Sequence, residues 1–286
     1  MRQRTRTAYA FLTPYLLVFA AFWVWPIINS FLISFQATRT VPWRFAPTFN
    51  WGRLIADPAF YNALTNTLII LVIQVPIMIA LATVLATLLN SSMLKARGLF
   101  RFAFFAPVVV GEVAYAAVFR LMFNHEFGIV NKMIALAGVP AIPWLASPNA
   151  AMAVIIIALT WRWAGYNAII ILAGLQSIPE DVYEAATLDG VSKTRQFFFI
   201  TLPLLRPVIV LCVVISVIGT MQLFSEPFLI TNRGGPGQAT ETLGLFLYRQ
   251  AFGAFNFGYA SAIAYTIAAL AVAISLINLW LGRERE

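Results

Sequence analysis

The chain has 286 residues, of which 61% are hydrophobic and only 10% charged, and its mean hydropathy is +0.83. A soluble domain carries about 25% charged and about 45–50% apolar residues, so this apolar excess is too large for a soluble core. We therefore expect the lipid bilayer to be the solvent of this protein. A net charge of +8 also occurs in nucleic-acid-binding proteins, but here the basic residues lie mainly at the ends of apolar runs, which indicates membrane topology instead.

The sequence offers few residues for metal, redox or catalytic chemistry. A single cysteine, Cys212, and a single histidine, His125, exclude an intramolecular disulfide and a zinc site made of Cys and His. No G-x4-G-K-[ST] phosphate-binding loop is present, so we expect this chain to bind no ATP, no metal and no other cofactor. His125 lies in an expected outer loop and is assigned no catalytic role. We expect a protein that is not an enzyme.

Six apolar stretches are long enough to cross a bilayer as helices, which takes about 20 residues. Because backbone polar groups inside lipid must bond within their own segment, the expected fold is all-α, a bundle of six transmembrane helices in one domain over 1–286. The first stretch follows several arginines, as in a signal peptide, but it has no small-residue cleavage site, so we interpret it as a retained span. The expected spans are 9–35, 62–89, 101–123, 149–175, 206–230 and 257–281.

Lysines and arginines near the span ends indicate the orientation. More of them fall in the inner segments if the N-terminus is cytoplasmic, so we expect a multi-pass protein of the cell (inner) membrane with both termini in the cytoplasm. The basic residues at the two ends that contribute to this bias are Arg2, Arg4, Arg6, Arg283 and Arg285.

The inner loop between the fourth and fifth spans, 176–205, has the pattern of a helix, a sharp turn and a second helix. Ser177 and Glu180 have the spacing of a capping box at a helix start, and Gly190 can adopt the positive φ that ends a helix. We expect the second helix to begin at Ser192 and to stop at Pro203.

The first of these helices carries a small apolar face made by Ala185 and Ala186. Small side chains allow the backbone of another protein to come close, so the helix can lie in a groove of a partner. The alternative is an amphipathic helix at the membrane surface that packs on its own bundle.

The segment Glu184-Ala185-Ala186-x3-Gly190-x9-Ile200-x-Leu202-Pro203 is similar, at every named position and spacing, to the EAA signature of ABC importer permeases. The resemblance covers nearly the whole chain and is to the maltose and glycerol-3-phosphate permease group. Arg233 departs from it, because that family commonly has a glycine there. Other matching segments are Phe102–Pro107, Trp161-x3-Gly165, Leu229–Gly237 and Ala239–Thr242.

This resemblance implies a permease subunit that moves a sugar or related polyol into the cytoplasm. It implies a second permease subunit, two cytoplasmic ATPase subunits that bind ATP and Mg, an extracytoplasmic solute-binding protein, contact with membrane lipid and no nucleic acid. The solute stays open among oligosaccharide, monosaccharide, polyol and glycerophosphodiester. The residues that the resemblance assigns to ATPase coupling are Glu184, Ala185, Ala186, Asp189 and Gly190.

Two charged residues are expected near the middle of neighbouring spans, where charge is costly and is a functional candidate by default. Glu112 belongs to the third span and Arg162 to the fourth, and adjacent antiparallel helices would let them form a buried ion pair. We rank a pair that stabilises packing above direct solute contact.

Rings and amides near mid-depth suit a sugar, whose apolar faces stack on aromatic side chains while its hydroxyls need hydrogen-bond partners. We expect Gln222 and Glu226, one helical turn apart, to share a face of the fifth span. The alternative is hydrogen bonding between helices together with packing. The candidates for the substrate path are Tyr166, Asn167, Gln222, Phe224 and Glu226.

Two other functions remain open. A secondary transporter or channel would predict paired broken helices and would leave the Glu184–Pro203 signature without a reason. A membrane-embedded enzyme would need convergent His, Asp or Ser residues at one depth, which the sequence lacks.

Overall fold

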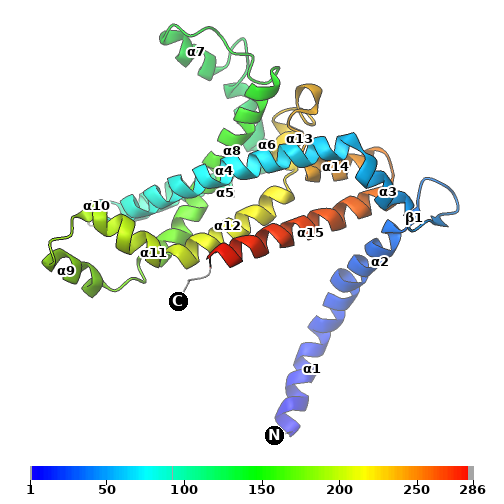
Figure 1. Cartoon of the computed structure of the whole chain (residues 1–286), viewed down its shortest axis with the longest axis horizontal. Helices are drawn as coiled ribbons and strands as arrows, with labels where there is room; N and C mark the ends of the chain where they lie inside the picture. The colour runs from blue at the N-terminus through cyan, green and yellow to red at the C-terminus, as the bar shows by residue number, and fades with distance from the viewer. Residues whose placement is uncertain (1, 92, 283–286) are drawn as a thin grey trace. The chain divides into compact units, whose positions relative to one another are not determined.

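A computed structural model describes residues 2–91 and 93–282, with side chains from Tyr9 onward. The described chain is built almost entirely from helices (Figure 1), which confirms the all-α class. One short antiparallel sheet pairs β1, Gln36–Ala37, with β2, Arg44–Phe45. The terminal arginine side chains that contribute to the expected orientation, Arg2, Arg4, Arg6, Arg283 and Arg285, lie outside the described side chains.

The chain forms two compact units: Met1–Phe60 with Phe246–Ala268, and Tyr61–Leu245 with Ala269–Glu286. The helices are α1 Arg2–Phe19, α2 Trp25–Ser34, α3 Phe49–Ala56, α4 Pro58–Asn90, α5 Arg97–Val109, α6 Glu112–Met122, α7 Ile129–Leu136, α8 Pro148–Leu175, α9 Glu180–Leu188, α10 Lys193–Gln196, α11 Leu202–Leu204, α12 Arg206–Met221, α13 Ser225–Leu229, α14 Leu243–Tyr248 and α15 Phe257–Gly282. Short π or 3-10 turns are η1 Ala20–Val24, η2 Phe197–Thr201, η3 Pro236–Gln238 and η4 Arg249–Gly253.

In the first unit, polar contacts tie α2 and α3 to the beginning of α15. The Tyr265 hydroxyl lies 3.0 Å from the Ser30 hydroxyl, and its ring packs edge-on against Phe31 at 5.0 Å. The Asn50 amide donates to the carbonyls of Ser34 and Gln36, where α2 ends and its last carbonyls need partners.

In the second unit, α8 contributes thirteen buried residues. One apolar cluster joins α8 to α4 and α12, and a second joins α8 to α4 and α6. Since α8 is apolar on most of its surface, it suits the centre of a membrane bundle.

Four described helical stretches are long and apolar enough to cross a membrane, or up to six if each of two bent helix pairs is one span. The expected third span is broken, because α5 and α6 meet at 95°. Val110 and Gly111 are both extended there, at ψ 130° and 138°. Pro107, just before the break, has no backbone N–H to donate to the preceding turn, which favours an interruption.

The inner loop follows the expected order of helix, turn and helix, with different ends. Gly190 has the expected positive φ, 74°. The capping box is wrong: the Ser177 hydroxyl donates back to the Gly174 carbonyl at 2.7 Å, and Pro179 precedes α9 without a side-chain cap. Pro203 does not stop the second helix, because the π turn η2 shifts the hydrogen bonding ahead of it. The bend of 62° comes at Leu205 instead.

Gly165 allows α8 to pack directly on the backbone of α5. A Cβ atom built there would lie 1.8 Å from the Phe104 carbonyl oxygen, closer than any real contact. Glycine is therefore required at this crossing.

We predict that Gly165→Ala separates α5 from α8 and lowers the stability of the purified protein by on the order of 1–3 kcal/mol. Gly98→Ala, within α5, is the matched control because nothing lies within 4 Å of its added Cβ. Thermal unfolding in detergent should show a lower Tm for the first variant alone. Equal Tm values would contradict the close approach.

Candidate functional site

A cavity of about 260 Å³ lies in the second unit, where α4, α6 and α8 meet the interruption between α12 and α13. All five candidates for the substrate path line it, together with Glu112. The complete lining is Gln74, Met78, Glu112, Leu159, Trp163, Tyr166, Asn167, Ile215, Ser216, Gly219, Thr220, Gln222, Leu223, Phe224, Ser225 and Glu226.

The interruption differs from the continuous fifth span that we expected. Helix α12 ends at Met221, and Phe224 has the non-helical angles φ −133° and ψ −49° before α13 begins. Gln222 and Glu226 therefore do not share one helix face; they reach the cavity from the end of one helix and the beginning of another.

The loop before α14 and the start of α14 hold this interruption in place. The Leu223 carbonyl, left without a helical partner, accepts a hydrogen bond from the Thr242 hydroxyl. A Cβ atom at Gly244 would lie 2.7 Å from the Gln222 carbonyl oxygen, so only glycine permits this approach.

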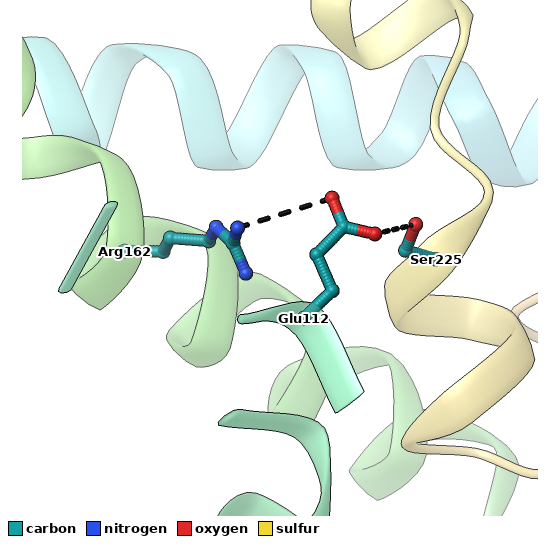
Figure 2. A network of polar contacts seen from close by, with 3 residues as sticks. All are labelled: Glu112, Arg162 and Ser225. Carbon is teal, nitrogen blue, oxygen red and sulfur yellow. Dashed lines mark hydrogen bonds and ion pairs between the residues drawn. The ribbon is translucent and has the colours of Figure 1, made fainter. Parts of the chain in front are cut away.

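Glu112 is the first residue of α6 and contacts two other elements (Figure 2). Figure 2 shows its carboxylate between the guanidinium of Arg162 on α8 and the hydroxyl of Ser225 on α13. Arg162 Nη2 lies 3.8 Å from Glu112 Oε1, and Ser225 Oγ donates to Glu112 Oε2 at 2.5 Å. The structure thus brings Glu112 and Arg162 together, but the expectation of a fully buried pair is wrong. The Arg162 side chain is 7% exposed and that of Glu112 55%, because the helix break places Glu112 at the cavity.

Aromatic rings surround the buried guanidinium. The Arg162 carbon Cζ lies 4.9 Å from the centre of the Tyr115 ring and 5.9 Å from that of Trp163, within the range of cation–π attraction. Arg162 Nε and Nη1 are buried and have no hydrogen-bond partner among the described residues. Glu112 and the rings therefore provide most of the compensation for this buried charge.

Asn167 lines the cavity, and its side-chain amide is only partly paired. Its Nδ2 donates to the Trp163 carbonyl at 3.0 Å and lies 3.5 Å from the sulfur of Met78. Its Oδ1 is buried and has no hydrogen-bond partner within the described chain.

Sequence reasoning missed Ser225, Gln74 and Ser216 as cavity residues. Ser225 immediately precedes the candidate Glu226, but its role depends on a helix break that apolar composition does not reveal.

The expected coupling residues lie in and just after α9, and four of them, Glu184, Ala185, Asp189 and Gly190, are exposed. Ala186 is only 7% exposed and faces its own chain, so the expected face of Ala185 and Ala186 is wrong. Consecutive helical residues point about 100° apart, which separates these two. The exposed apolar side chain missed by sequence reasoning is Leu188, 88% exposed at the end of α9.

Side-chain hydrogen bonds make this loop a defined unit. The Gln196 amide donates to Thr187 Oγ1 at 3.1 Å and to the Val191 carbonyl at 3.0 Å. The hydroxyls of Tyr183 and Thr201 lie 2.9 Å apart. Together these contacts connect α9 to the helix that leads into α12.

Residues 51–284 match the family model described as "Binding-protein-dependent transport system inner membrane component". The chain is 41% identical over 280 residues to the lactose transport system permease protein LacF of Rhizobium radiobacter, covering 96% of this chain and 94% of that protein. It is 34% identical over 275 residues to the arabinooligosaccharides transport system permease protein AraP of Bacillus subtilis (strain 168), covering 96% and 88%.

The trehalose/maltose transport system permease protein MalF of Thermococcus litoralis is 30% identical over 286 residues, covering 99% of this chain and 96% of that protein. The fold matches a chain from the crystal structure of a bacterial ABC transporter involved in the import of the acidic polysaccharide alginate. That match has a TM-score of 0.86 at 23% identity, covers 98% and 96% of the two chains, and shows the common fold.

We predict that Glu112→Gln lowers stability by about 1–3 kcal/mol, because the Arg162 charge stays buried beside a neutral amide. Adding Arg162→Gln should recover part of that loss, since no charge is then stranded. Expression and thermal unfolding of the two single variants and the double variant measure this coupling. Losses that simply add would show that the two side chains do not interact.

Proposed function

Because the chain belongs to the family of binding-protein-dependent transport system inner membrane components, we propose that it is the transmembrane permease subunit of an ABC importer for a sugar or related polyol. The observation that carries this proposal is the cavity between the interrupted helices, lined by all five expected path residues. Its permease relatives, which carry names of lactose, arabinooligosaccharide and trehalose/maltose systems, support a saccharide as the solute. The family is one of transport components and not of enzymes.

The cavity has the chemistry that a saccharide needs. Rings of Trp163, Tyr166 and Phe224 offer apolar faces on which a pyranose can stack. The polar groups of Asn167, Gln222 and Glu226 offer hydrogen bonds to its hydroxyls. We assign these residues to the solute path, with Glu112 at its edge.

The protein is a multi-pass membrane protein, and we assign both termini to the cytoplasm and residues 1–286 to one permease domain. On this assignment α9 lies on the cytoplasmic side. The excess of lysine and arginine in the segments on that side supports the orientation.

We assign Glu184, Ala185, Ala186, Asp189 and Gly190 to coupling with a cytoplasmic ATPase. Ala185 and the exposed Leu188 would make the contact, while Ala186 packs the helix on its own loop. In this proposal ATP and Mg bind to two ATPase subunits and not to this chain. A second permease subunit completes the pore, a solute-binding protein delivers the solute, and lipid surrounds the bundle.

A secondary transporter was expected to have paired broken helices. The broken helices found here nevertheless do not favour that alternative. They are present here, at α5–α6 and at the end of α12, in a chain of the ABC-importer family. Broken helices therefore do not discriminate between the two mechanisms. The Glu184–Pro203 signature and the family match favour the importer.

The proposed solute path predicts that Gln222→Ala and Glu226→Gln raise the solute concentration for half-maximal uptake at least about tenfold. The first removes a hydrogen-bond partner and the second replaces a carboxyl acceptor by a weaker amide, each change worth on the order of 1.5 kcal/mol. Uptake of lactose, maltose, trehalose and arabinobiose into cells that carry the complete importer is the measurement. Gln250→Ala, outside the cavity lining, is the control and should leave uptake unchanged. Unchanged affinity in both cavity variants, with normal assembly, would place the solute elsewhere.

The proposed coupling surface predicts that Leu188→Glu and Glu184→Lys abolish uptake and the copurification of ATPase, while this chain stays in the membrane with its partner permease. Glu126→Lys makes the same charge reversal at an exposed position in an expected outer loop and should have no effect. Normal uptake in both α9 variants would mean that the ATPase docks on another surface.

A further inference from the structure

The hydrogen-bond donors of several cavity side chains are already occupied by the protein. Ser225 Oγ donates to Glu112 at 2.5 Å, and Ser216 Oγ donates to the Cys212 carbonyl at 2.7 Å. Asn167 Nδ2 donates to the Trp163 carbonyl, while its buried Oδ1 has no partner in the described part of the chain. The two serine hydroxyls therefore act as acceptors toward whatever enters the cavity, while the buried Asn167 Oδ1 does not face it.

The lining of the cavity contains two carboxyl side chains and no basic one. Among its lining residues, all of them described, the ionisable acids are Glu112 and Glu226, and no lysine or arginine is present. Arg162 lies behind Glu112, buried, with its Nη2 directed to Oε1 of that carboxylate. Glu112 thus separates the guanidinium from the cavity and presents its own half-exposed carboxylate instead.

A lining that contains carboxyl groups and no basic side chain discriminates between solutes of the same shape. The hydroxyls of a neutral saccharide can donate to the carboxyl groups of Glu112 and Glu226. A carboxylate or phosphate group has no proton to donate, so it leaves those acceptors unpaired. It also meets the like charge of Glu112, and close to a protein this repulsion is stronger than in bulk water.

We propose that this cavity admits uncharged saccharides and rejects anionic ones, and that Glu112 is the residue that determines this specificity. Arg162 and Ser225 act as positioning residues, because they hold the two oxygens of its carboxylate. This inference rests on the proposed function, since it names the solute class of the same cavity.

Binding to the complete membrane complex in lipid nanodiscs, without a solute-binding protein, tests the inference. Saturation-transfer NMR compares the neutral disaccharides lactose, maltose and trehalose with counterparts in which one primary hydroxyl is oxidised to a carboxylate. We expect the wild-type complex to bind the acid at least about tenfold more weakly than the neutral sugar. Glu112→Gln should lower that ratio at least about threefold, while Glu226 stays in the lining. Glu112→Asp, which keeps the charge, should preserve discrimination, as should the control Glu126→Gln outside the cavity.

Equal binding of the acid and the neutral sugar by the wild-type complex overturns the inference, and so does preferential binding of the acid, which would point to contact with Arg162. An unchanged ratio in a folded Glu112→Gln complex removes Glu112 from the role. If the Glu112→Gln complex does not assemble, the ratios of acid to neutral-sugar binding in the wild-type and Glu112→Asp complexes still decide whether the inference holds. The proposed function fails separately, if ATP-driven uptake by the complete importer is found for none of these sugars, neutral or acidic.

Discussion

A helix inside a lipid bilayer can be interrupted only where the freed N–H and C=O groups find other partners or line a wet space. Two apolar segments of this chain are interrupted, one at Val110 and Gly111 and one after Met221. At the second, the Thr242 hydroxyl satisfies a freed carbonyl, and Gly244 allows close backbone contact. The cavity lies between these interruptions. Its existence therefore depends on the surrounding residues that satisfy the broken backbone.

The buried charge of Arg162 also constrains the structure around the cavity. A guanidinium in an apolar bundle is costly unless it is paired, and here its nearest acid is Glu112. The break between α5 and α6 makes this pairing possible, because it places Glu112 at the start of a new helix and facing the cavity. The hydrogen bond from Ser225 then joins the first interruption to the second. Charge compensation and cavity shape thus depend on one carboxylate.

Local patterns in the sequence determined the helical class, the approximate extent of the apolar segments and the turn at Gly190. Each of these depends on residues close together in the chain: apolar runs, turn chemistry, or a positive φ that favours glycine. The candidates Tyr166, Asn167, Gln222, Phe224 and Glu226 were also identifiable, because polar and aromatic residues in apolar segments are few. Their suitability for binding a sugar suggested that they lie together, and the structure places all five in the lining of one cavity.

Tertiary structure alone decided where the helices break and which side chains meet across them. An apolar run has the same composition whether it is continuous or bent by 95°, so the segment around Gly111 predicted one straight span. The capping box expected at Ser177 does not form, because the Ser177 hydroxyl donates instead to the Gly174 carbonyl near the end of α8. The exposed face of α9 was set by packing against its own loop, which buried Ala186 and left Leu188 in solvent. The Ser225 hydroxyl donates to Glu112, which lies 113 positions away in the chain, and no local sequence pattern contains such a contact.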